Sequence, residues 1–189
     1  MFAIFFEFCR TISGIFRLEQ GPKDLPYSVL GMGLSLVVYA LVKFGVEYFK
    51  LPVEAALLSG LLDTLIMVLI ASGALLVRGL SRRTPQTLMA CAVVGGLISL
   101  VALLVTALMS ISHVPLTSTY ALRVLTFPLT AWNLIINAHI LRQALSAGFV
   151  LGLVLSLIIF GAAWGVTTAI SPDPGPINFG TGALGRQPL

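Results

Sequence analysis

Charged residues are scarce in this chain: they make up 10% of its 189 residues, whereas hydrophobic residues make up 58%. A water-soluble globule needs a polar coat that this composition cannot supply. The mean hydropathy of +1.03 indicates that lipid is the main solvent. Apolar residues also occur in blocks longer than about 18 residues, which is enough for a helix to cross a hydrocarbon core of about 30 Å. The sequence therefore predicts an all-α integral membrane protein.

The alternation of apolar and polar residues that a transmembrane β-strand needs is also missing. Residues 61–71 and 97–108 are apolar almost continuously, so a membrane barrel is not expected. The first residues lack the basic region and the small-residue cleavage site of a removable signal peptide. We expect the first span to act as the insertion signal.

Motifs that carry chemistry are absent from the sequence as well. There is no Gly-x-Ser-x-Gly elbow and no glycine-rich phosphate loop before a Lys-Ser or Lys-Thr pair. Cys9 and Cys91 form no Cys-x-x-Cys motif and are expected to be packing thiols. His113 and His139 are expected at opposite membrane faces, so they cannot share a zinc ion. The sequence predicts no catalytic residues, no metal site and no cofactor.

What is present is a series of long apolar segments separated by short loops. Residues 1–20, rich in aromatics, are expected to form an interfacial amphipathic helix. Gly21–Pro26 is expected to be a hinge, with Pro26 opening the next helix. Residues 21–170 form the predicted five-helix transmembrane domain, and the Pro/Gly-rich tail 171–189 is expected to be disordered alone. The predicted spans are about 27–47, 53–77, 87–111, 119–141 and 147–170.

Lys and Arg near the spans predict the orientation, because cytoplasmic segments carry their excess. With a cytoplasmic N-terminus, seven of the 11 basic residues lie inside and four lie outside. The inside set is Arg10, Arg17, Lys23, Arg78, Arg82, Arg83 and Arg142, and the outside set is Lys43, Lys50, Arg123 and Arg186. The sequence thus predicts a multi-pass protein of the cell (inner) membrane with its C-terminus on the opposite side. The basic residues form no stripe, so no nucleic-acid partner is expected.

Asp63 falls near the middle of the second predicted span, where an unpaired carboxylate costs several kcal/mol. Such a residue is either structural, holding helices together through hydrogen bonds, or part of a transport or proton path. We expect its partners on the most polar face of the fourth span. These candidates are Arg123, Thr126, Thr130 and Asn133.

The fourth predicted span also carries two asparagines four residues apart, Asn133 and Asn137, which lie on one helix face. They are expected to hydrogen-bond across helices or to a carbonyl that Pro128 leaves unpaired. His139 and Arg142 lie near the cytoplasmic end. There they are expected to reach lipid phosphates.

Small residues recur at one-turn spacing, a pattern typical of close helix packing in lipid. The clearest cases are Gly95 with Ser99, and Gly148 with Gly152 and Ser156. The second ridge either packs inside the bundle or meets a partner. We expect this ridge and the tail to contribute to a partner contact.

The layout resembles that of the compact bacterial members of the Yip1 domain family. The resemblance covers about residues 15–170 and rests on the Gly-Pro-x-Asp-Leu-Pro hinge at 21–26 and on residues 132–145. The latter begin Trp-Asn-Leu and end His-Ile-Leu-Arg-x-Ala-Leu. The resemblance implies a non-enzymatic membrane scaffold or adaptor with a cytoplasmic N-terminus.

Two functions follow as hypotheses. The first is a scaffold or accessory subunit of a membrane complex, whose partners are membrane lipids and either other membrane proteins or further copies of the chain. The alternative is a small transporter or channel that uses Asp63 and the polar face of the fourth span. An odd span number and a single mid-membrane acid argue against the alternative.

Overall fold

The computed structural model describes residues 2–111 and 118–170, with side chains placed for residues 6–108 and 126–170. These residues form six α-helices and two short 3₁₀ turns, and none of them lies in a strand, which confirms the all-α prediction. The helices are α1 Phe2–Phe16, α2 Val29–Tyr48, α3 Val53–Val77, α4 Thr84–Ile111, α5 Ser118–Ala144 and α6 Phe149–Ile170. The 3₁₀ turns are Pro22–Asp24 and Ser81–Arg83.

Four of the described helices are long and apolar enough to cross a membrane: α2, α3, α4 and α6. This finding is consistent with the predicted membrane protein. Helix α5 has a similar length, but it contains Pro128 and several polar residues, including Asn133, Asn137 and Arg142. It is therefore less apolar than its neighbours.

The helix bounds follow the predicted spans closely. Helix α3 covers residues 53–77 as predicted, whereas α4 begins three residues before the predicted start at 87. Helix α5 ends at Ala144, three residues beyond the predicted end at 141. The last turn of α5 contains Arg142 and Gln143, so the helix continues past the apolar block into polar residues.

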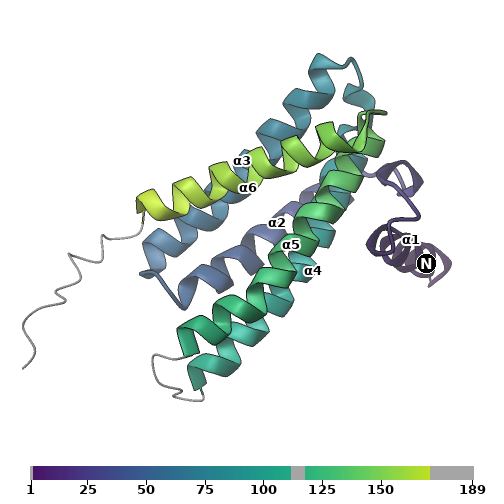
Figure 1. The fold of residues 1–189 in the computed structure, drawn as a ribbon. Helices are drawn as coiled ribbons and strands as arrows, with labels where there is room; N and C mark the ends of the chain where they lie inside the picture. Colours follow the sequence, from purple (N-terminus) through teal and green to yellow (C-terminus); the bar gives the residue numbers. More distant parts are fainter. Residues whose placement is uncertain (1, 112–117, 171–189) are drawn as a thin grey trace, which may run out of the picture.

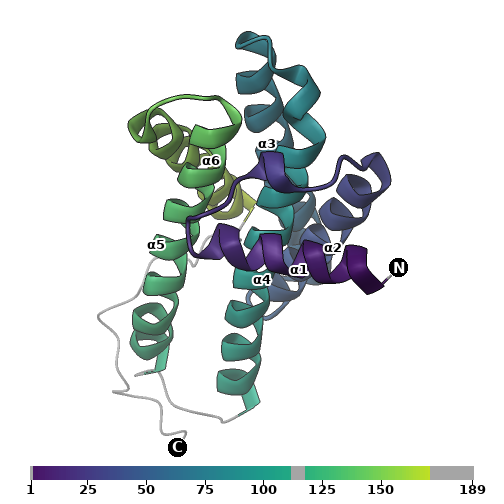
Figure 2. The ribbon, with the colours of Figure 1, turned by 90° about the vertical axis from the view of Figure 1, so that its right-hand side faces the viewer.

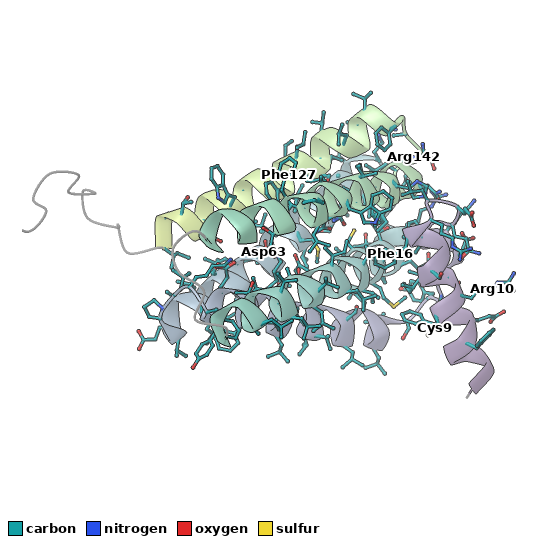
Figure 3. All side chains as sticks on the ribbon, turned by 60° about the horizontal axis from the view of Figure 1, so that its bottom comes forward. Cys9, Arg10, Phe16, Asp63, Phe127 and Arg142 are labelled. Atoms are coloured by element: carbon teal, nitrogen blue, oxygen red, sulfur yellow. The ribbon has the colours of Figure 1, made fainter. Side chains whose placement is uncertain are left out.

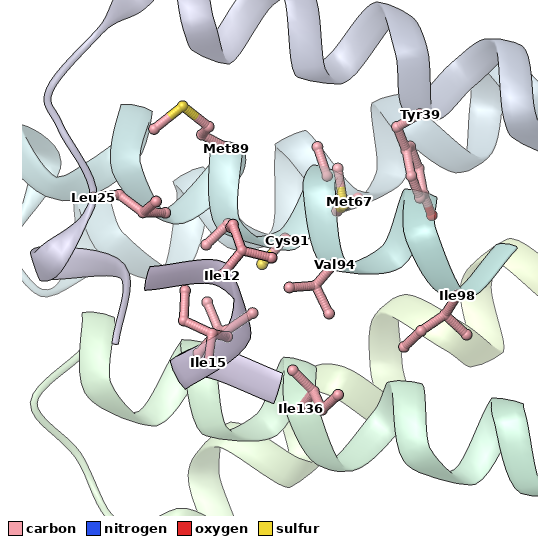
Figure 4. Close-up of a cluster of buried hydrophobic side chains, with 13 residues drawn as sticks. Ile12, Ile15, Leu25, Tyr39, Met67, Met89, Cys91, Val94, Ile98 and Ile136 are labelled. Atoms are coloured by element: carbon pink, nitrogen blue, oxygen red, sulfur yellow. The ribbon is translucent and has the colours of Figure 1, made fainter. Parts of the chain in front are cut away.

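Helices α2, α3 and α5 pack against α4 (Figure 1). Helices α4 and α5 run side by side, α2 packs against α3 and α4, and α6 packs against α3 and α5. Helix α1 lies across α4 and α5 (Figure 2). Ile12 and Ile15 of α1 are buried there, against Cys91 and Val94 of α4 and Ile136 of α5 (Figure 4).

The segment between α1 and α2 turns sharply, as the hinge prediction requires. Pro22–Asp24 forms a 3₁₀ turn, and an Asp24 carboxylate oxygen accepts a hydrogen bond of 2.9 Å from Gly21 N–H. Pro26 does not open α2, and that expectation was wrong. Helix α2 begins at Val29, because Ser28 Oγ accepts a hydrogen bond from Gly31 N–H and caps the helix instead.

Glycines set the closest approaches between neighbouring helices. A Cβ atom on Gly60 of α3 would lie 2.9 Å from Phe44 N of α2. A Cβ atom on Gly152 of α6 would lie 2.2 Å from Ala138 O of α5. Only glycine permits such backbone contacts, which let dispersion forces hold helices together in lipid.

The glycine and serine ridge of α6 faces α5, so the expectation that Gly152 and Ser156 meet a partner was wrong. Ser156 Oγ donates a hydrogen bond of 3.1 Å to Leu134 O, beside the Gly152 contact. Gly148, in contrast, borders open space, because a Cβ atom there would have no neighbouring atom of the described residues within 4 Å. Ser99 on α4 is buried, with 7% of its surface exposed.

Candidate functional site: an ion pair within the helix bundle

Asp63 of α3 binds two side chains of α2. Tyr39 Oη donates a hydrogen bond of 2.7 Å to Asp63 Oδ2. Lys43 Nζ lies 3.3 Å from the same carboxylate oxygen and forms an ion pair with it. Figure 3 shows Asp63 within the helix bundle. The three residues form a polar cluster between α2 and α3, and we call it the Asp63 cluster.

The helix hairpin explains why these three residues meet. Helices α2 and α3 are joined by only four residues, 49–52, so they pack antiparallel. Tyr39 and Lys43 are four residues apart and therefore share one face of α2. The Lys43 ammonium also lies 5.7 Å from the centre of the Tyr39 ring.

Helix α4 closes the far side of the cluster. A Cβ atom on Gly95 would lie 3.0 Å from Tyr39 Cε2, and one on Gly96 would lie 3.8 Å from Tyr39 Cδ2. The absence of side chains at Gly95 and Gly96 leaves room for the tyrosine ring. Gly95 therefore helps to hold the Tyr39 hydroxyl against Asp63.

In the Asp63 cluster, the Lys43 ammonium neutralises the charge of the Asp63 carboxylate. An isolated carboxylate at this depth is costly, but a cation and a hydroxyl donor on one oxygen offset much of the cost. The side chains of Lys43 and Asp63 remain 26% and 13% exposed. The two charged side chains are therefore mostly covered by the chain, but each keeps some exposed surface.

Asp63 bonds to α2, whereas two of its predicted partners on the fourth span, Thr130 and Asn133, bond within α5. Thr130 Oγ1 donates instead to Thr126 O within its own helix, at 3.0 Å. The side chain of Arg123 lies outside the described side chains. The sequence analysis overlooked Lys43 because it assigned this residue to the outer side of the membrane. The flexible Lys43 side chain instead brings its ammonium to Asp63.

The two asparagines of α5 also bond differently from the prediction. Asn137 Nδ2 donates to Asn133 O at 3.0 Å and to the Asn133 side-chain oxygen. Asn137 thus donates to Asn133 within one helix, because residues four apart stack on the same face. Among the described residues, neither asparagine side chain forms the expected hydrogen bond to another helix.

His139 does not reach toward lipid phosphates, and that expectation was wrong too. It is 2% exposed, and its Nε2 lies 3.0 Å from Gln20 O and 2.9 Å from Gln143 Nε2. It thus ties residues 20–26, which we call the strap, to α5. Arg142 lies nearby, with its guanidinium 5.8 Å from the centre of the Phe149 ring.

Sequence reasoning missed Tyr39, Lys43 and Gln20. The spacing of Tyr39 and Lys43 on an apolar helix was the available signal, since it places two polar groups on one face opposite Asp63. No sequence pattern indicated Gln20, because its contact with His139 is made by its backbone carbonyl.

Other ligand-type side chains do not gather. Within residues 2–111 and 118–170, no three His, Cys, Asp or Glu residues converge as metal ligands would. Cys91 is buried as expected of a packing thiol, whereas Cys9 is exposed on α1, contrary to expectation. His113 lies outside the described residues.

Comparison with protein-family models, with curated proteins and with solved structures finds no match. The resemblance to the Yip1 domain family therefore stays a prediction.

Proposed function

We propose that this chain is a non-enzymatic membrane protein that serves as a Yip1-like scaffold or adaptor, or as an accessory subunit of a membrane complex. The Asp63 cluster is the observation that carries this proposal. Its carboxylate already has a cation and a hydroxyl donor from the same chain, so the mid-helix acid has a structural role. A site that binds and releases an ion would leave coordination open for it.

The proposed topology has five spans, with α5 as the fourth and with α1 lying in the interface. Several polar groups of α5 already have partners within the chain, which lowers the cost of placing this helix in lipid. One end of the bundle gathers Lys23, Arg78, Arg82, Arg83 and Arg142, and we call it the basic end. This clustering favours a cytoplasmic basic end in the cell (inner) membrane.

We predict that reporter fusions after Gly79 and after Pro188 give opposite signals. Three spans separate the two points if α5 crosses the membrane, so Gly79 is cytoplasmic and Pro188 is not. A fusion after Leu51 is the control, and it must give the signal opposite to that after Gly79. Cytoplasmic signals at both Gly79 and Pro188 would contradict the five-span proposal.

We also predict that the protein co-purifies in mild detergent with a stoichiometric membrane protein or with further copies of itself. Native mass measurement of the full chain would give the composition of the assembly. Deletion of residues 173–189 should lower partner recovery while insertion is kept, since an extended apolar and proline-rich segment can lie on a neighbouring surface. Recovery only of a lone monomer would contradict the scaffold proposal.

The alternative function, a small transporter or channel, is favoured by one observation. Lys43 and Asp63 form an ion pair between two apolar helices, and their side chains are still 26% and 13% exposed. Charged residues at such a depth are common in transport paths. Asp63→Asn discriminates between the two functions, because it removes the charge and keeps a hydrogen-bond acceptor for Tyr39.

A further inference from the structure

An open pocket of about 350 Å³ lies between α1 and the strap. Glu7 and Arg10 of α1 line it on one side, and Asp24 of the strap lines it on the other. Phe8, Leu25 and Pro26 add apolar surface. A volume of this size is at the lower end of the range for small-ligand sites, which is about 300–1,000 Å³.

The strap wall of this pocket is fixed by hydrogen bonds to two helices. Gln86 Nε2 of α4 donates to Leu25 O at 2.6 Å, and His139 of α5 lies at hydrogen-bond distance from Gln20 O. The Asp24 carboxylate accepts from Gly21 N–H and so keeps its own position. Because these contacts hold the wall in place, the pocket is preorganised for a ligand.

The charged groups around the pocket have spare binding capacity. Among the described side chains, neither the Glu7 carboxylate nor the Arg10 guanidinium forms an ion pair. Asp24 uses one oxygen for Gly21, which leaves its other oxygen as an acceptor. Two carboxylates and one guanidinium suit a ligand that carries both an ammonium and a phosphate.

We propose that this pocket binds the head group of an ethanolamine phospholipid. Glu7 and Asp24 accept hydrogen bonds from its primary ammonium, and Arg10 donates to its phosphate. Phe8 and Pro26 contact the carbon atoms that lead into the lipid. The inference rests on the proposed function, in which α1 lies at the membrane interface.

The charge balance and the position of the pocket favour this lipid over other ligands. The lining of the pocket holds two carboxylates and one guanidinium, so it pairs better with a head group that carries an ammonium than with a purely anionic one. Free phosphoethanolamine shares the polar chemistry but has no acyl chains to enter lipid. The pocket is lined by α1 and the strap, which pack against the long apolar helix α4, and the acyl chains of a phospholipid can pack along such a helix.

Native mass spectrometry of the full chain in mild detergent tests the proposal. The probe is an equimolar mixture of phosphatidylethanolamine, phosphatidylcholine and phosphatidylglycerol with identical acyl chains. We expect the ethanolamine lipid to bind about three- to tenfold better than the other two, as is typical for one or two charge-assisted hydrogen bonds. Glu7→Gln should reduce this preference, and Arg10→Gln should weaken both zwitterionic lipids.

Glu19→Gln and Arg17→Gln are the matched controls, because these exposed residues are close in sequence and do not line the pocket. Both should keep the wild-type lipid preference. Equal binding of all three lipids by the wild type would overturn the proposal, as would an unchanged preference in both Glu7→Gln and Arg10→Gln. Full displacement of the lipid by millimolar phosphoethanolamine would show that the ligand is the soluble ester. None of these readouts requires a partner protein, so they are separate from the test of the scaffold function.

Discussion

Replacement of Gly152 by leucine is expected to abolish most of the folded yield. A Cβ atom at this position would lie 2.2 Å from Ala138 O and 3.0 Å from Arg142 N, and both atoms belong to the α5 backbone. Neither atom can move aside as a flexible side chain could, so α6 must separate from α5. The separation would also break the hydrogen bond from Ser156 Oγ to Leu134 O. We expect a loss of about 3 kcal/mol or more, measured as folded fraction and thermal stability in detergent.

Gly148→Leu and Gly161→Leu are matched controls on the same segment. Nothing among the described residues lies within 4 Å of a Cβ atom at either position, so both variants should keep wild-type stability. If Gly152→Leu folded normally and lost only partner binding, the ridge would be a partner surface after all. Equal destabilisation by all three variants would point to a general effect of leucine on α6.

The helices of this protein are predictable from its sequence because the apolar blocks are long and the breaks between them are sharp. Residues 49–52 and 78–83 interrupt the blocks with Pro, Gly and charged residues. The hinge at Gly21–Pro26 was predictable for the same reason, since proline and glycine disfavour a continuous helix there. Periodicity along the sequence thus contains most of the local structure.

The partners of polar groups were much less predictable. The fourth span offers more polar residues than α2, yet Asp63 bonds to α2 because the short α2–α3 connection places these helices together. Counting polar residues cannot show which face of a helix they occupy relative to a neighbour. The same limit applies to His139, whose contact is a backbone carbonyl far away in the sequence.

The pocket between α1 and the strap is a feature that the sequence pattern does not predict. The sequence indicates a hinge, but the hydrogen bonds from Gln86 and His139 determine where the strap lies. These bonds place Asp24 opposite Glu7 and Arg10 across an open space. Such a juxtaposition depends on tertiary packing, and local propensity does not contain it.

Asp63→Leu is expected to lower the free energy of unfolding by about 3 kcal/mol, because it leaves the Lys43 ammonium and the Tyr39 hydroxyl without their acceptor. Lys50→Gln is the matched control. Lys50 and Glu47 also lie 3.3 Å apart, but the Lys50 side chain is 49% exposed. Loss of this exposed pair should cost less than about 1 kcal/mol. Thermal unfolding in detergent would compare the variants.

The double variant Lys43→Met and Asp63→Leu tests whether the cost comes from a stranded charge. It should recover much of the stability that Asp63→Leu loses, since it removes both charges and leaves only the tyrosine hydroxyl unpaired. Asp63→Asn should be tolerated, because its amide oxygen still accepts from Tyr39 and the long Lys43 side chain can turn toward the interface. If the role of the cluster is structural, both the recovery in the double variant and the tolerance of Asp63→Asn must be observed. If Asp63→Leu folded normally while Asp63→Asn abolished function at unchanged expression, the ionisable group itself would be essential, and the transporter function would replace the scaffold.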